Sequence, residues 1–160
     1  MVIKVPKGFY QIIKGKEVIL KTEFLGSGVA IGVLDKINEI GGLCYYVLPY
    51  KEHDIEIEDG ELVLSGESLI PLFFEELEKS GADFQIAKVV VVGASVYKNN
   101  PKDLELPETN LKVAKSLIKK KIAFENNVTF KINFNCQVYA EVNLKEKSIK
   151  INLNGKEEIL

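Results

Sequence analysis

The sequence contains no arginine, and all 21 of its basic residues are lysines. It therefore lacks the planar guanidinium group that holds a carboxylate or phosphate with two parallel hydrogen bonds, and any bound anion would rely on lysine or main-chain N–H groups. The formal net charge is −2 and the sequence pI is ≈ 5.6. A chain with this balance has no overall attraction to a phosphate backbone, so we expect no nucleic-acid partner.

Long apolar segments and metal-binding residues are also scarce. The first residues, MVIKVPK, lack the apolar core of a signal peptide, and no stretch is long enough to cross a bilayer. We therefore expect a cytoplasmic protein without membrane insertion. Cys44 and Cys136 are too few for a disulfide framework and have no metal-ligand spacing, so we interpret both as buried small apolar residues. We expect no metal and no other cofactor.

The length and apolar content indicate one folded unit. A chain of 160 residues with 46% hydrophobic residues can bury one core, so we predict a single domain spanning residues 1–160. Runs of β-branched and aromatic residues predict strands, and the most continuous of these runs predict strands covered on both faces. The predicted strands lie at residues 8–13, 18–24, 29–34, 40–48, 85–92, 122–124, 128–134, 137–144 and 148–153.

Two segments have the apolar spacing of helices. The first is predicted over residues 67–80, with Pro71 in its first turn and Gly81 as its stop. In the second, Thr109 is a good N-cap for a helix that ends near Lys120. Two helices separated by runs of strands indicate an α+β fold.

Two further segments are predicted to be irregular or solvated. Residues 97–107 contain two prolines and are predicted to form a loop. Residues 51–61 are acidic and contain His53, the only histidine. The alternation of acidic and apolar residues there favours a surface loop or a short edge hairpin over a metal cluster.

A tight turn separates two of the predicted strands. Gly26 and Gly28 flank Ser27 between two apolar runs. Two glycines around a small polar residue allow positive φ angles and let a ligand approach main-chain N–H groups. The segment therefore predicts a small pocket, with the N–H groups of Gly26 and Gly28 directed into it.

The sequence around this turn resembles a known family. Residues 24–30 read FLGSGVA and residues 41–49 read GGLCYYVLP. Together they are similar to the signature of the chemoreceptor glutamine deamidases, the CheD family, in which Gly-Leu-Gly-Ser-Cys-Val-Ala precedes a strand containing His-x-x-Leu-Pro. The resemblance implies that the family's nucleophilic cysteine falls at Gly28, its activating histidine at Tyr45 and a threonine of the same site at Thr22.

The resemblance extends along most of the chain. Residues 8–14 and 92–96 look like the family's opening strand and a later strand end, and Asn110 looks like the asparagine that precedes its second helix. Residues 133–138 retain none of the family's glycine-rich segment. The resemblance implies a mixed β-sheet sandwich flanked by two main helices. It also implies a protein partner, either a CheC-type phosphatase or the cytoplasmic helices of a chemoreceptor.

The replaced positions argue against the family's chemistry. Amide hydrolysis by a cysteine needs a thiolate, a base within hydrogen-bond reach and donors that stabilise an oxyanion. Gly28 supplies no nucleophile, and a tyrosine with an ordinary pKa of about 10 is a poor proton acceptor near neutral pH. We therefore expect an inactive homologue that acts by protein binding, with Thr22, Ser27 and Tyr45 lining the cleft that remains.

The alternative is an active amidohydrolase with a rearranged nucleophile. Ser27 would need a base, and no motif connects His53 to the turn. Cys44 cannot replace the lost thiol, because side chains alternate along a strand and Cys44 points away from the site if Tyr45 points into it. Replacement of both catalytic positions therefore favours loss of the chemistry.

Overall fold

The structure, a computed structural model, describes residues 1–57, 60–96, 101–122, 125–132 and 134–160, and only the main chain of residues 101–104 and 125. The strands of the two large sheets are β1 (Val2–Val5), β2 (Phe9–Lys14), β3 (Ile19–Thr22), β4 (Val29–Asp35), β5 (Ile40–Tyr46), β8 (Lys88–Gly93), β9 (Val128–Ile132), β10 (Val138–Asn143), β11 (Ser148–Leu153) and β12 (Lys156–Ile159). The other elements are β6 (Ile55–Glu56), β7 (Leu62–Val63), α1 (Gly66–Lys79), α2 (Pro101–Lys121) and the 3-10 turns η1 (Lys51–His53) and η3 (Glu125–Asn127).

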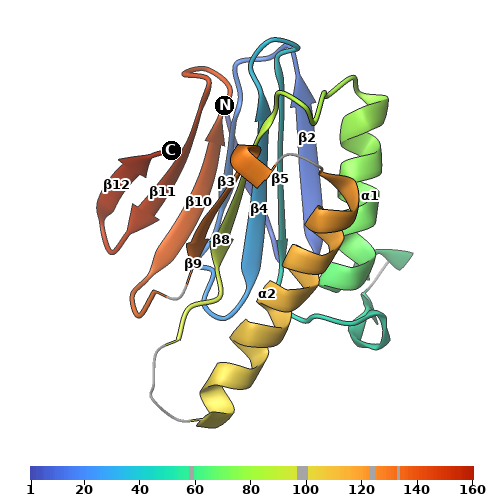
Figure 1. The fold of residues 1–160 in the computed structure, drawn as a ribbon, viewed down its shortest axis with the longest axis vertical. Coiled ribbons are helices and arrows are strands. Elements are labelled where there is room, and N and C mark those ends of the chain that lie inside the picture. The colour runs from blue at the N-terminus through green and yellow to red at the C-terminus, as the bar shows by residue number, and fades with distance from the viewer. Residues whose placement is uncertain (58–59, 97–100, 123–124, 133) are drawn as a thin grey trace.

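Two five-stranded sheets pack face to face, and the two helices cover the outer face of one of them (Figure 1). Sheet A has the strand order β1-β3-β10-β11-β12, and sheet B has the order β2-β5-β4-β8-β9. Both sheets are mixed, because β1 runs parallel to β3 and β9 runs parallel to β8, whereas the other pairs are antiparallel. The predicted α+β fold, a mixed-sheet sandwich with two flanking helices, is confirmed.

Sheet B is buried on both faces. Every residue of β4 and β5 is buried, because the helices cover one side and sheet A covers the other. In β8, Val89 and Val91 pack in the helix layer, whereas Val90 and Val92 pack in the layer between the sheets. Strands of this kind are apolar at every position, which confirms the doubly covered strands that the sequence predicts.

Helix α1 largely follows its prediction. Its N-cap Ser65 accepts a hydrogen bond at Oγ from the N–H of Ser68 (3.3 Å), and Gly81 follows it with a φ of +101°. The buried face consists of Leu69, Ile70, Phe73, Phe74 and Leu77. Because the helix begins at Gly66, Pro71 lies in the second turn rather than in the predicted first turn.

Helix α2 is longer than predicted. It begins at Pro101, and Thr109, the expected N-cap, lies inside it and donates from Oγ1 to the carbonyl of Glu105 (2.8 Å). Proline is favourable at the first helical position because its missing N–H has no helical partner there, so Pro101 starts the helix. Residues 97–100 lie outside the described residues, and the remainder of the predicted loop is helical.

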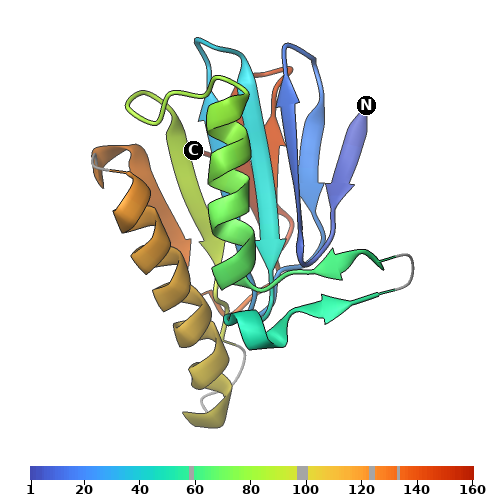
Figure 2. The ribbon, with the colours of Figure 1, turned by 90° about the vertical axis from the view of Figure 1, so that its right-hand side faces the viewer.

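Both helices lie side by side on the same face of sheet B (Figure 2). An ion pair between Lys121 and Glu78 joins the end of α2 to α1, which is consistent with the predicted solvated lysine end. Within the described residues, neither helix combines the length and the apolar character needed to cross a membrane.

The edges of the sheets depart most from prediction. β1 and β12 were not expected, and the turn after β2 leads to β3 in the other sheet. The predicted strand 122–124 is wrong at Ile122, which follows α2 outside any strand, and its other two residues lie outside the described residues. The acidic segment folds into η1 and the antiparallel β6–β7 pair, which confirms the short hairpin.

Candidate functional site

The turn at residues 26–28 joins β3 to β4 and is closed by its own main chain. Gly26 has a φ of +56°, whereas the φ of Gly28 lies outside the left-handed region. The N–H of Gly28 donates to the carbonyl of Leu25 (2.9 Å). The N–H of Gly28 is therefore used inside the turn, which differs from the expectation that it faces an open pocket.

Neighbouring elements hold the carbonyls of this turn. The N–H of Ser95 donates to Gly26 O (2.9 Å), Asn110 Nδ2 donates to Ser27 O (3.1 Å) and the N–H of Ala94 donates to Gly28 O (2.9 Å). Gly93 has a φ of +119°, and a Cβ there would lie 2.3 Å from the carbonyl oxygen of Gly28. Only glycine permits this approach, so the turn is fixed against the end of β8 and against α2.

Gly28 and Tyr45 are in direct contact across the site. A Cβ atom at Gly28 would lie 2.7 Å from Tyr45 Cε1 and 2.6 Å from the main-chain oxygen of Tyr46. Real Cβ atoms do not approach other atoms this closely, because close-packed interiors leave no room for such overlap. The tyrosine ring therefore occupies the space that any side chain at position 28 would need.

Tyr45 fills the interior rather than covering a pocket mouth. Its side chain is 4% exposed, and its hydroxyl lies 3.4 Å from each of the carbonyl oxygens of Phe24 and Leu25. Burial raises the pKa of Tyr45 to about 12, and the carboxylate of Glu23 adds to the shift. The phenol therefore keeps its proton at neutral pH and cannot accept one from a nucleophile.

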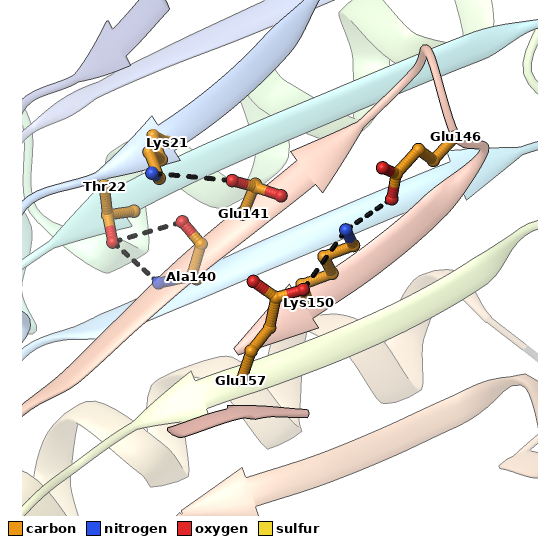
Figure 3. A network of polar contacts seen from close by, with 7 residues as sticks. All are labelled: Lys21, Thr22, Ala140, Glu141, Glu146, Lys150 and Glu157. Carbon is orange, nitrogen blue, oxygen red and sulfur yellow. Dashed lines mark hydrogen bonds and ion pairs between the residues drawn. The ribbon is translucent and has the colours of Figure 1, made fainter. Parts of the chain in front are cut away.

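Thr22 is buried and uses its hydroxyl within sheet A. Its Oγ1 accepts a hydrogen bond from the N–H of Ala140 (3.0 Å) and donates to the carbonyl of the same residue (3.5 Å) (Figure 3). The neighbouring Lys21 points the other way and pairs with Glu141 (3.6 Å). Thr22 on β3 and Tyr45 on β5 thus both face the layer between the sheets, although the threonine hydroxyl is already bonded to β10.

Ser27 has no base beside it. Its residue is half-buried, and His53 lies in η1, where its Nδ1 accepts a hydrogen bond from the N–H of Tyr50 (3.2 Å). Among the described residues, no interaction joins His53 to Ser27. The described residues also contain no group of three or more His, Cys, Asp or Glu side chains that could hold a metal ion.

Cys44 lies on the opposite face of β5 from Tyr45, as predicted. It is fully buried in the helix layer, whereas Tyr45 belongs to the layer between the sheets. Burial raises the pKa of the Cys44 thiol far above its ordinary value. Cys136 is half-buried rather than buried, because it lies in the turn before β10.

Asn110 is the residue whose position the sequence does not predict. It is fully buried on α2, and besides Ser27 O its Nδ2 binds the carbonyl of Val47 (2.7 Å). Its own carbonyl accepts a hydrogen bond from the hydroxyl of Tyr46 (2.6 Å). The resemblance marks this asparagine, but only the structure shows that it connects α2 to the turn and to the end of β5.

Sequence comparisons place this geometry in a family, although no family model matches the chain. The chain is 33% identical over 121 residues to a probable chemoreceptor glutamine deamidase CheD of Methanococcus maripaludis strain C5, which covers 75% of each protein. It is also 33% identical over 121 residues to the probable CheD of Pyrococcus abyssi, covering 74% of this chain and 72% of the relative. A probable CheD of Methanococcus vannielii is 31% identical over 122 residues, or 75% of each protein. The chain belongs to the CheD family of chemoreceptor glutamine deamidases.

Proposed function

We propose that this chain is a catalytically inactive member of the CheD family that acts in the cytoplasm by binding another protein. The contact between Gly28 and the Tyr45 ring carries the proposal. The family resemblance assigns these two positions to the nucleophile and the base, so a single aromatic ring takes the place of both groups. A retained scaffold without chemistry suits a binding role.

The surroundings of this contact support the proposal. A nucleophilic site needs a donor for the oxyanion, yet the N–H of Gly28 bonds to Leu25 O and the Thr22 hydroxyl bonds to Ala140. The expected partners are a CheC-type phosphatase or the cytoplasmic helices of a chemoreceptor, because the relatives are named chemoreceptor glutamine deamidases. Binding would use the surface around the half-buried Gly26 and Ser27.

The competing function is an active amidohydrolase that uses another nucleophile. Ser27 is the hydroxyl that the turn leaves half-buried, but a serine without a neighbouring base is a weak nucleophile. The two functions make opposite claims about glutamine deamidation and can be separated directly.

The test combines a deamidation assay with a binding assay. A chemoreceptor cytoplasmic fragment is incubated with the wild type and with Ser27→Ala, and the mass increase of glutamine conversion is followed by mass spectrometry. We expect no increase with either protein, together with saturable calorimetric binding of the fragment or of a CheC-type phosphatase. A time-dependent increase that Ser27→Ala abolishes would establish the serine enzyme, and one that persists would overturn both functions.

A further inference from the structure

A groove runs along the free edge of β2, between that strand and α1. β2 is an edge strand of sheet B and pairs with β5 alone among the described strands. The groove has a volume of about 500 Å³, and its walls come from residues 8–12, from Leu62 and Leu64 beside β7, and from Leu69 and Glu76 of α1. It includes neither residue of the Gly28–Tyr45 contact, so it is a separate surface.

The main chain of β2 offers unpaired hydrogen-bonding groups to this groove. The N–H of Gly15 donates to the carbonyl of Glu39 beyond the start of β5 (2.9 Å), so every second residue back along β2 bonds to β5. Tyr10 and Ile12 lie between those residues, and their N–H and C=O groups point into the groove. Within the described residues these outward groups have no main-chain partner.

One rung of a strand pairing already exists at the end of this edge. The N–H of Leu64 donates to the carbonyl of Gly8 (3.1 Å), two residues before Tyr10. Figure 2 shows the β6–β7 hairpin passing this end of the sheet and then turning away into α1. The edge therefore accepts a main-chain donor at Gly8 and leaves the next two outward positions open.

The other sheet edges carry charges that discourage strand addition, whereas this one does not. β12 contains Lys156, Glu157 and Glu158, β9 is tied to β12 by the ion pair of Lys131 and Glu158 (2.8 Å), and β1 contains Lys4. β2 has no charged residue before Lys14 at its end. An uncharged edge with unpaired main-chain groups is a template for another strand.

We propose that the β2 edge binds an extended segment of a partner protein as an added strand. Main-chain groups of Tyr10 and Ile12 supply the hydrogen bonds, and the apolar wall at Leu69 receives side chains of the added strand. The segment carries a lysine or arginine, because Glu76 is the one charged residue in the lining. This binding site goes beyond the proposed function and does not depend on it.

The local charges favour a basic partner segment over a second copy of this chain. Burial raises the pKa of the Tyr10 hydroxyl, and the carboxylates of Glu76 and Glu75 raise it further against the opposing effect of Lys79, so the potential at the groove is negative. A symmetric pairing of two β2 edges would bring the two Glu76 carboxylates towards each other, which is unfavourable.

The test uses a blocked eight-residue peptide in which valine alternates with threonine and lysine. Calorimetry should detect binding to the wild type at millimolar peptide, and backbone amide exchange at Tyr10 and Ile12 should slow. Ile12→Pro removes an outward N–H without breaking a bond to β5, and we expect about tenfold weaker binding. Ile12→Val is the matched control and should bind like the wild type.

A second probe keeps the test decisive if Ile12→Pro does not fold. The same peptide with alternate amides N-methylated cannot form the strand pairing, and it should bind about tenfold more weakly or not at all. No detectable binding of the unmodified peptide, or equal binding of the methylated one, would overturn the proposal. So would concentration-dependent dimerisation of the protein alone that Ile12→Pro abolishes, because the occupant would then be a second copy.

Discussion

The two layers on either side of sheet B each contain a tyrosine packed against a glycine, and they differ in how the hydroxyl is used. Tyr46 faces the helix layer, where a Cβ at Gly66 would lie 2.5 Å from its ring, and its hydroxyl donates to the carbonyl of Asn110 at 2.6 Å. Tyr45 faces the layer between the sheets against Gly28, but its hydroxyl lies 3.4 Å from two carbonyls. The helix layer is thus tied by a short hydrogen bond, whereas the family's catalytic position is filled mainly by ring volume.

The largest expected effect comes from Gly28→Cys, which breaks the packing between the sheets. The new Cβ overlaps the Tyr45 ring and the main-chain oxygen of Tyr46, and overpacking of this kind destabilises by about 3 kcal/mol. Urea unfolding measures the loss, and Ser27→Cys is the matched control because Ser27 is half-buried.

Combining Gly28→Cys with Tyr45→His sharpens this result. Removal of the phenol ring relieves one overlap, while the overlap with the main chain remains, so stability should recover only in part. An additive loss in the double variant would contradict the direct contact between the two positions.

Gly66→Ala makes the corresponding change in the helix layer. All three nearest atoms to a Cβ at Gly66 belong to the Tyr46 ring, and the ring is held by its bond to Asn110. We expect a loss of about 2 kcal/mol in urea unfolding. If Gly66→Ala is as stable as the wild type, the ring moves freely and the contrast between the layers is wrong.

Tyr46→Phe removes the short hydrogen bond and keeps the ring. We expect a loss of about 1.5 kcal/mol, because the buried carbonyl of Asn110 loses a donor. The thermal midpoint and the urea midpoint should fall together. A loss no larger than that of Tyr45→Phe would contradict the difference between the two hydroxyls.

Tyr45→Phe should have the smallest effect at neutral pH, about 0.5 kcal/mol or less, because the hydroxyl makes only two long contacts. The effect should appear at alkaline pH instead. Burial raises the pKa of Tyr45 to about 12 in the folded protein, above about 10 in the unfolded chain. Stability is therefore present below pH of about 10 and falls as pH rises towards 12. Urea midpoints measured across this range should fall less steeply in Tyr45→Phe than in the wild type.

The sequence predicts the elements whose own residues determine them. Strands β4, β5 and β8 are continuous apolar runs, and the face of α1 follows from apolar spacing, so these predictions are confirmed. The start of α2 is missed because Pro101 can end a loop or begin a helix, and the choice depends on packing against the rest of the chain. β1 and β12 are short and partly exposed, so they carry little apolar pattern.

The candidate site is predictable in direction but not in contact. Alternation along β5 correctly separates Cys44 from Tyr45. That the Tyr45 ring reaches Gly28, and that Asn110 binds the carbonyls on either side of it, depends on residues brought together from distant segments. The predicted open cleft is replaced around Gly28 by a buried ring, because a side chain larger than histidine occupies the base position.

The pairing of β3 with β10 determines when the chain can finish folding. Thr22 and Ala140 are separated by 118 positions, and β1 and β3 meet the rest of sheet A only through β10. During synthesis, every strand of sheet B emerges before β10, so the sheet face that carries Ala30, Leu43 and Val90 has no cover in the meantime. Ribosome-bound chains that end before residue 138 should therefore present this apolar face to chaperones, and emergence of β10 and β11 should end that exposure.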